Sequence, residues 1–273
     1  MPTSSFATDD IQLELKQPLG HGGQTSLSYK VRIRGKEYFM KQLRPEQKSD
    51  HRYRALFQKE FEVGSAVDHS HVVRYLQMGE DADGVFILME YVNGQTLEQK
   101  LALEPEYFRQ GGNFEKVFRQ LLEGIGVLHR ANVAYMDISP ENVMLTQVSG
   151  DVKIVDLGFC LADSYSHTVG CSMKFAAPEL RQRNLGAVDS RTDIYAIGQL
   201  MNYIKDEAKV ALPSRLQHII DKCRQEGKLH RYNNVDEALA ELDHKRTTQW
   251  KVWSVILSAL LIISVMWGGG VDL

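Results

Sequence analysis

Hydrophobic and polar positions divide the chain into an alternating first part and a helical remainder. Residues 13–78 alternate apolar and polar residues in short runs broken by glycine, with one helical pattern from about Tyr53 to Val67. Residues 85–92 form an apolar run that is typical of a buried strand. Strands first and helices later predict an α+β chain with two lobes, a small sheet-rich lobe and a larger helical lobe.

The second part of the chain carries several helical periods. From Phe114 to Arg130 apolar residues recur with the spacing of a helix that has a wide buried face. Residues 143–145 and 152–155 predict a short hairpin. Three further helices are expected at about residues 193–205, 215–224 and 235–243. Together these elements make up the larger, helical lobe.

The last part of the chain differs from the predicted lobes. No residue from 252 to 271 carries a charge, and about 18–20 helical residues span a ~30 Å hydrocarbon layer. Tryptophans lie near both ends of this stretch and basic residues precede it, at Trp250, Trp253, Trp267, Lys245, Arg246 and Lys251. The pattern predicts a single-pass membrane anchor with the folded domain in the cytoplasm. The alternative is a buried C-terminal core helix.

These patterns predict six consecutive parts in the chain. They are an N-terminal tail at 1–10, a sheet-rich N-lobe at 11–92, a helical C-lobe at 93–243, a basic juxtamembrane linker at 244–251, a transmembrane helix at 252–267 and a short tail at 268–273. The two lobes account for nearly all of the part that is expected to be soluble.

Composition adds little to this division but excludes some partners. The formal net charge is −3 and 25% of residues are charged, which describes an ordinary soluble surface. No block of Lys and Arg stands alone, so nucleic-acid binding is not expected. The three cysteines have neither metal-ligand spacing nor an even number for disulfides, which favours a reducing, cytoplasmic compartment for the domain.

Candidate chemistry is concentrated in one stretch of the helical lobe. Asp137 and Asn142 lie five residues apart, and Asp156 opens the turn Asp156-Leu157-Gly158 after the predicted hairpin. Phosphoryl transfer uses an aspartate at the attacking hydroxyl, and an asparagine and a second aspartate for Mg²⁺. Asp137 alone would also suit a turn-capping role, which is common for aspartate in loops. The ordered set favours phosphoryl transfer from ATP with Mg²⁺.

With other residues of the chain, this set resembles the eukaryotic-type (Hanks-type) protein kinase superfamily over roughly residues 11–243. The matching features follow the family's order: a glycine-rich loop at 19–27, a strand ending at Lys41, a helix carrying Glu60, the loop at 137–142, Asp156-Leu157-Gly158 and Ala177-Pro178-Glu179. The resemblance implies a bilobal kinase fold. It implies that Asp137 accepts the substrate's hydroxyl proton and that Asn142 and Asp156 coordinate Mg²⁺.

The resemblance also implies a nucleotide site at the sheet-rich lobe. Lys41 would hold the α- and β-phosphates and Glu60 would pair with it, with Glu62 as the rival partner. Glycines let the backbone approach phosphates closely, and residues 86–92 resemble the hinge that binds adenine through its backbone. The expected nucleotide contacts are Gly20, Gly22, Leu27, Lys41, Glu90, Val92 and Met144.

Several positions depart from the family's pattern. Thr25 replaces the third glycine, Met136 replaces the arginine before the catalytic aspartate, and Ser139 replaces the lysine that is aimed at the γ-phosphate. Phe39 stands where the family has alanine above the adenine ring. A phenyl ring there adds volume to a close-packed site, so either the pocket is rebuilt around it or the ring fills the adenine space.

The sequence leaves three functions open. The first is a membrane-anchored kinase that transfers the ATP γ-phosphate to Ser/Thr hydroxyls of proteins. The alternative is a pseudokinase that scaffolds partners, with weak or no ATP binding because of Phe39. The third is a small-molecule phosphotransferase, which commonly lacks a closing segment such as 177–179. The same resemblance implies that Arg231 pairs with Glu179 and that Asp193 supports the catalytic loop, which agrees with a protein kinase.

Overall fold

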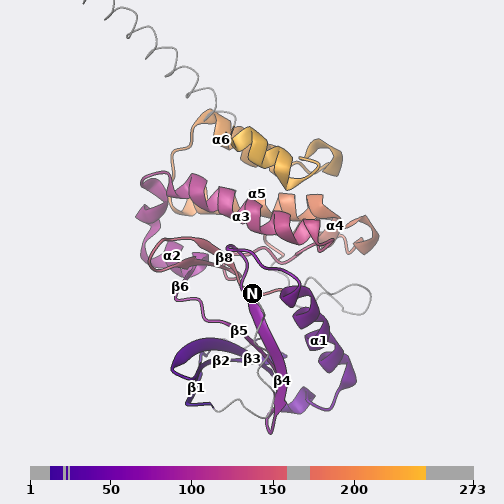
Figure 1. Ribbon diagram of the computed structural model, residues 1–273. Helices are drawn as coiled ribbons and strands as arrows, with labels where there is room; N and C mark the ends of the chain where they lie inside the picture. Colours follow the sequence, from indigo (N-terminus) through magenta and orange to yellow (C-terminus); the bar gives the residue numbers. More distant parts are fainter. Residues whose placement is uncertain (1–12, 21–22, 24, 159–172, 244–273) are drawn as a thin grey trace, which may run out of the picture.

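The computed structural model describes residues 13–20, 23, 25–158 and 173–243 of the chain. These residues form a sheet-rich lobe and a helical lobe, which lie at opposite ends of the molecule (Figure 1). The first lobe holds one antiparallel sheet of five strands in the order β1-β2-β3-β5-β4. Its elements are β1 (Leu15–Pro18), β2 (Ser26–Ile33), β3 (Lys36–Leu43), a 3₁₀ turn (Pro45–Gln47), α1 (His51–Ser65), β4 (Tyr75–Asp81) and β5 (Gly84–Glu90).

The turn between β2 and β3 sets the register of this sheet. Arg34 and Gly35 connect Ile33 to its partner Lys36, and both turn residues have positive φ angles, 50° and 73°. A two-residue turn of this kind matches the right-handed twist of the flanking strands. Side chains alternate between the two faces along a strand. The length of the turn therefore decides which residues of β2 face each side of the sheet.

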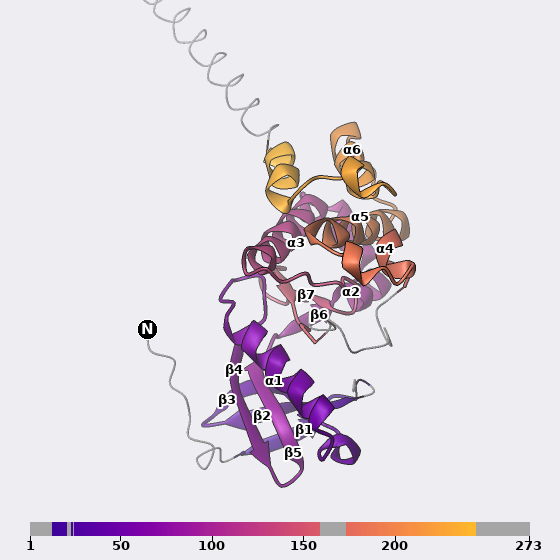
Figure 2. The ribbon, with the colours of Figure 1, turned by 90° about the vertical axis from the view of Figure 1, so that its right-hand side faces the viewer.

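The two faces of the sheet bury different side chains. Tyr38 and Met40 of β3 point to the outer face, where they join a small cluster with residues of β2 and β5. Phe39 and Leu43 lie on the other face. Leu43 belongs to the main core and Phe39 packs against it. Helix α1 lies across this second face (Figure 2). The face that carries α1 is therefore the one that continues into the helical lobe.

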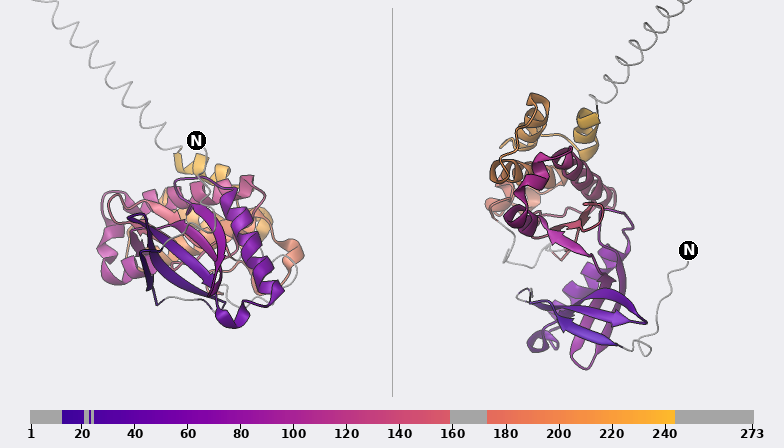
Figure 3. Two further views of the ribbon diagram at one scale, coloured as in Figure 1. Left: turned by 60° about the horizontal axis from the view of Figure 1, so that its bottom comes forward. Right: turned by 90° about the vertical axis from the view of Figure 1, so that its left-hand side faces the viewer.

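The helical lobe is built from long helices and a second, small sheet. Its elements are β6 (Gly94–Thr96), α2 (Leu97–Leu103), a 3₁₀ turn (Pro105–Arg109), α3 (Asn113–Arg130), β7 (Val143–Thr146), β8 (Val152–Ile154), α4 (Pro178–Arg181), a 3₁₀ turn (Leu185–Ala187), α5 (Ser190–Glu207), α6 (Ser214–Cys223) and a 3₁₀ turn (Lys228–His230), and residues 235–243 are helical. Helix α5 contacts both α3 and α6. The β6-β7-β8 sheet lies on the side of this lobe that faces the other lobe (Figure 3).

Backbone hydrogen bonds tie the two lobes together. The segment between α1 and β4 runs beside β8, where the Val73 amide donates to the Ile154 carbonyl at 2.8 Å. The Ile154 amide in turn donates to the His71 carbonyl at 2.9 Å. Gly124 of α3 lets this segment approach, because a Cβ there would lie 2.8 Å from Ile154 Cδ1 and 3.2 Å from the His71 carbonyl oxygen.

The structure confirms the two-lobed α+β fold and most of the expected elements. The helices expected at 53–67, 114–130, 193–205 and 215–224 correspond to α1, α3, α5 and α6, the helix expected at 235–243 is present, and the expected hairpin corresponds to β7 and β8. Helix α2 was not anticipated, because a helix of seven residues is too short to show a clear period.

The predicted membrane segment cannot be compared with the fold, since residues 252–267 lie outside the described residues, as do 1–10, 244–251 and 268–273. Among the helices of the described ranges, none is both long enough and apolar enough to cross a bilayer.

Candidate active site

Three charged side chains from different elements meet between the lobes. Lys41 Nζ on β3 lies 2.8 Å from Glu60 Oε1 on α1 and 3.0 Å from Asp156 Oδ1, which follows β8. Glu60 is only 3% exposed. The expected pair of Lys41 and Glu60 is therefore present. The rival Glu62 is exposed and accepts a hydrogen bond from Gln58 Nε2 on its own helix.

Burial and the neighbouring charges act against each other on the pKa values of this cluster. Burial raises the pKa of Glu60 and outweighs the opposing charge of Lys41. Burial would lower the pKa of Lys41, but the nearby carboxylates of Asp156 and Glu60 outweigh it and raise that pKa. Burial would likewise raise the pKa of Asp156, but the charge of Lys41 and the Gly158 amide outweigh it, so that pKa is lowered. Lys41 is thus held as a cation and Asp156 as an anion.

The loop after α3 brings Asp137 and Asn142 together. Asn142 Nδ2 donates to Asp137 Oδ2 at 2.7 Å and to the Asp137 carbonyl at 3.0 Å. The Val155 amide donates to the Asn142 carbonyl at 3.1 Å. Asp156 follows directly and accepts from the Gly158 amide at 2.8 Å. The three residues expected to act on the hydroxyl and the metal are therefore linked by hydrogen bonds, since Asn142 contacts Asp137 through its side chain and Val155, next to Asp156, through its backbone.

A buried carboxylate on α5 holds the backbone just before Asp137 through hydrogen bonds. Asp193 near the start of α5 is 0% exposed, and it accepts from the amides of Tyr135 at 2.8 Å and Met136 at 2.7 Å. Met136 has a φ of 63°, a left-handed conformation that is uncommon for a residue with a side chain. His129 Nε2 also lies 2.8 Å from Asp193 Oδ2. The expected supporting role of Asp193 is confirmed, and His129 is a partner that sequence reasoning missed.

The register of the sheet separates the residues expected at the nucleotide. Phe39 pairs with Lys30 and Met89, so it shares the face of Lys41, and it is half-buried. Leu27 pairs with Gln42, which places it on the opposite face. The residue directly opposite Lys41 on β2 is Ser28. The structure therefore does not bring the Leu27 side chain together with Lys41.

The remaining expected nucleotide contacts lie in several different elements. Gly20 has a φ of 65°, a backbone conformation that favours glycine, whereas Gly22 lies outside the described residues. Val92 follows β5 in the connection to β6, and Met144 on β7 is half-buried. Among these positions, the connection from β5 to β6 is the part whose backbone resembles an adenine-binding hinge.

The side chain of Glu90 has a structural partner that the sequence did not indicate. Its Oε1 lies 2.5 Å from Lys153 Nζ on β8 and accepts from the Arg74 amide at 3.0 Å. A nucleotide contact of Glu90 would therefore come from its backbone, as the resemblance to a hinge implies. The carboxylate instead ties the end of β5 to β8 and to the segment before β4.

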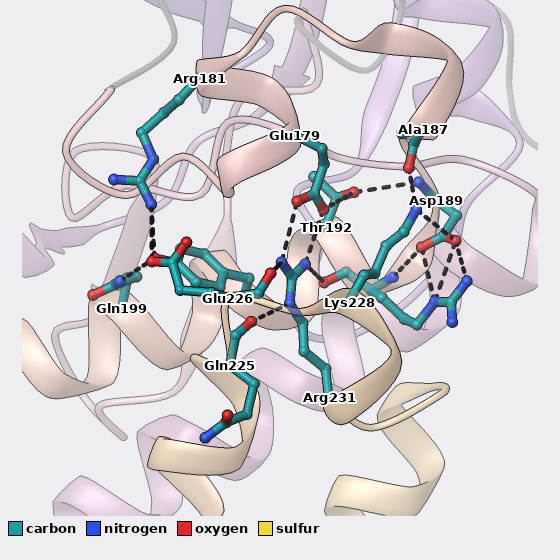
Figure 4. Close-up of polar contacts among 12 residues, drawn as sticks. Glu179, Arg181, Ala187, Asp189, Thr192, Gln199, Gln225, Glu226, Lys228 and Arg231 are labelled. Carbon is teal, nitrogen blue, oxygen red and sulfur yellow. Dashed lines mark hydrogen bonds and ion pairs between the residues drawn. The ribbon is translucent and has the colours of Figure 1, made fainter.

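A second buried ion pair closes the helical lobe. Arg231 NH1 and NH2 donate to the two carboxylate oxygens of Glu179 at 2.8 and 3.1 Å, and the Arg231 side chain is 0% exposed (Figure 4). The same guanidinium donates to three backbone carbonyls, those of Gln225, Glu226 and Arg191. Thr192 Oγ1 donates to Glu179 Oε1 at 2.9 Å. The expected pair of Arg231 and Glu179 is confirmed, with five acceptor atoms around one cation.

Comparison with known proteins agrees with this geometry. The family model described as "Protein kinase domain" matches residues 13–258. Serine/threonine-protein kinase PrkC of Bacillus subtilis is 24% identical over 84% of this chain and 40% of that protein. Probable serine/threonine-protein kinase SCO3848 of Streptomyces coelicolor is 33% identical over 69% of this chain and 29% of that protein. The chain thus spans less than half the length of these relatives.

A solved structure has the same fold. The crystal structure of the Mycobacterium tuberculosis PknI kinase domain matches with a TM-score of 0.64 and 21% identity, over 89% of this chain and 100% of that one. The two lobes and the match of the family model over residues 13–258 identify the family. The chain belongs to the protein kinase domain family.

The buried pair generates a first testable prediction. Replacing Arg231 with methionine leaves Glu179 as a buried charge without its cation, so we expect the free energy of unfolding to fall by about 3–5 kcal/mol. Urea denaturation followed by circular dichroism measures this change. The control is Arg52→Met, which removes an exposed pair with Asp50 and should change stability little. Equal effects of the two substitutions would contradict the structural role of the Glu179–Arg231 pair.

Proposed function

We propose that this chain is an ATP- and Mg²⁺-dependent protein kinase that phosphorylates Ser/Thr hydroxyls of proteins and is anchored to a membrane by its C-terminal segment. The observation that carries the catalytic part is the connected set of Lys41, Glu60 and Asp156 on one side and Asp137 with Asn142 on the other. A scaffold without catalysis has no need of this full set, and the named relatives are kinases.

The donor set suits Mg²⁺. Hard cations of this kind prefer carboxylate and amide oxygens, and Mg²⁺ is usually held by one or two carboxylates together with substrate phosphates. Asp156 offers a carboxylate. Asn142 donates through Nδ2 to Asp137, so its side-chain oxygen is the atom that remains to bind a cation. Within the described ranges, no group of three or more His, Cys, Asp or Glu side chains could hold a metal alone. When bound, Mg²⁺ would neutralise charge on the phosphates.

The reaction assigns one role to each side of the cleft. Lys41, fixed by Glu60, would hold the α- and β-phosphates of ATP. The carboxylate of Asp137 would accept the proton of the substrate hydroxyl, whose oxygen forms a bond to the γ-phosphorus as the bond to the bridging oxygen breaks and ADP leaves. Asn142, bonded to Asp137, would keep that carboxylate oriented. Each group supplies positioning or charge, which is what phosphoryl transfer requires.

Adenine can fit beside Phe39 if the neighbouring strand, β2, carries a small side chain at this place. The face of β2 that Phe39 shares carries Ser28 opposite Lys41, because Leu27 points to the other side of the sheet. A hydroxymethyl group is smaller than the branched side chain of valine or leucine. The smaller side chain on β2 would therefore offset the ring on β3, since cores tolerate exchanges that keep total volume.

The membrane part of the proposal depends on the composition of residues 252–271, none of which is charged and most of which are apolar, with basic residues before them. A stretch of this length and composition is typical of a transmembrane helix. The kinase domain would then act on proteins close to the cytoplasmic face of a bilayer.

Loss of either catalytic group is expected to abolish phosphorylation. Lys41→Met and Asp137→Asn should each lower kcat by about 10²-fold or more, since each removes a group that acts in the transition state. Incorporation of radioactive phosphate from labelled ATP into the chain and a general protein substrate measures this. Lys36→Met, on the same strand but exposed, and Asp83→Asn are matched controls that should keep activity. Wild-type rates in Lys41→Met or Asp137→Asn would refute the assigned roles.

Nucleotide binding can be tested apart from catalysis. ATP with Mg²⁺ at millimolar concentration should raise the melting temperature, by about 2–4 °C for each ~1 kcal/mol of binding stabilisation. Ser28→Val should reduce this shift, because the added methyl groups occupy the space that offsets Phe39. The double variant Ser28→Val/Phe39→Ala should restore it. No shift in the wild type combined with a gain in Phe39→Ala would favour the scaffold instead.

The anchor has a separate test. Deleting residues 250–273 should move the protein from the membrane fraction to the soluble fraction of a cell lysate, because the apolar stretch is removed. Deleting only residues 268–273 is the control, and this shorter deletion should leave the protein in membranes that have been washed with carbonate. If the protein without residues 250–273 stays in the membrane fraction, the predicted anchor is wrong, but the catalytic proposal is unaffected.

A further inference from the structure

A tyrosine on β4 joins the two halves of the candidate active site. Tyr75 is 5% exposed and lies on the face of the sheet that carries α1, opposite Met89. Its hydroxyl donates to Glu60 Oε1 at 3.1 Å. The same hydroxyl accepts from the amide of Leu157 at 3.2 Å. One oxygen atom therefore contacts the residue that pairs with Lys41 and the residue directly after Asp156.

A glycine in α1 makes this contact possible. Gly64 lies one turn after Glu60, so both residues are on the helix face that meets β4. A Cβ at position 64 would lie 2.4 Å from both Cγ and Cδ2 of the Tyr75 ring. Real side chains do not approach so closely, so any larger residue would displace the ring. The bare backbone at Gly64 lets the ring lie against the helix with its hydroxyl at Glu60.

The contact also suits the charge of its partner. Glu60 is buried, and a buried carboxylate needs hydrogen-bond donors to remain ionised. Lys41 supplies one cation and Tyr75 supplies an additional donor on the same oxygen. The hydroxyl also gives a partner to the Leu157 amide, a buried backbone group that is costly to leave unpaired. Both bonds depend on the positions of α1 and of the Asp156 turn at the same time.

We propose that Tyr75 is a positioning residue that couples the placement of α1, and hence of the Lys41–Glu60 pair, to the placement of the Asp156-Leu157-Gly158 turn. The consequence for catalysis depends on the kinase activity proposed above, whereas the coupling itself is a property of the fold. Movement of α1 away from β3 would break the bond to Glu60 and leave the Leu157 amide with a displaced acceptor. The hydroxyl therefore makes the phosphate-binding lysine and the metal-binding aspartate adopt their positions together.

Tyr75→Phe tests the proposal because it keeps the ring and removes only the hydroxyl. We expect hydrogen exchange at the Leu157 amide and around Glu60 to accelerate about tenfold, as for the loss of buried hydrogen bonds. In the kinase assay, kcat should fall about tenfold while KM for the protein substrate is unchanged. Tyr38→Phe, on the outer face of the same sheet, is the control and should change neither quantity.

Two results of this experiment would overturn the coupling. One is unchanged exchange at Leu157 in Tyr75→Phe. The other is faster exchange spread evenly over both lobes, which would reveal a merely structural contribution to stability. An inactive wild-type protein would refute the proposed kinase function alone, since the exchange measurement does not depend on activity.

Gly64→Ala gives a second test whose sign distinguishes coupling from helix stability. Alanine is a better helix former than glycine by ~1 kcal/mol, so helix propensity alone predicts slower exchange throughout α1. Displacement of the Tyr75 ring instead predicts faster exchange at Leu157, a residue in another element. Ser65→Ala on the exposed side of the same turn is the control and should leave Leu157 unchanged.

The two substitutions should also be non-additive, because both break the same connection. The double variant Gly64→Ala/Tyr75→Phe is expected to show the Leu157 exchange rate of Tyr75→Phe alone. Additive effects, or slower exchange at Leu157 in Gly64→Ala, would contradict the proposal.

Discussion

The arrangement between the lobes depends on the attraction of one cation, Lys41, to two carboxylates, those of Glu60 and Asp156. Lys41 is 19 residues from Glu60 and 115 residues from Asp156 along the chain, yet its Nζ lies within 3.0 Å of both carboxylates. Taking one charge out of water costs several kcal/mol unless a partner compensates it. Each of the three groups therefore stabilises the ionised form of another, and β3, α1 and the turn after β8 are held in one arrangement.

Buried charges serve a related purpose in the helical lobe. Asp193 accepts two successive backbone amides and holds Met136 in a left-handed conformation, while Arg231 donates to three backbone carbonyls besides Glu179. Tyr135, Met136, Gln225 and Glu226 all lie outside the helices and strands. In these loops the buried side chains replace the regular backbone hydrogen bonds of a helix or sheet, so the loop that carries Met136 keeps an irregular but defined shape.

The sequence predicts the parts of the site that have fixed spacing or a family motif. Lys41 and Glu60 lie inside a strand and a helix with a recognisable period, and Asp137, Asn142 and Asp156 belong to short motifs with fixed spacing. Residues that act through three-dimensional contacts were missed, namely His129, Tyr75 and Lys153. A tyrosine at the start of a strand has no sequence signal for a bond to a helix 15 residues earlier. Only the folded chain reveals such partners.

Leu27 shows a second limit of prediction from the sequence, namely the register of a strand pair. The turn at Arg34 and Gly35 explains it. Counting from the glycine loop predicts that Leu27 lies on the face of Lys41, but the strand register places Ser28 there. The register follows from the length of a turn that lies at the far end of both strands. Inserting or deleting a single residue in that distant turn would exchange the two faces of β2. The character of the nucleotide pocket can therefore change through the length of a surface loop, with no substitution among the residues that line it.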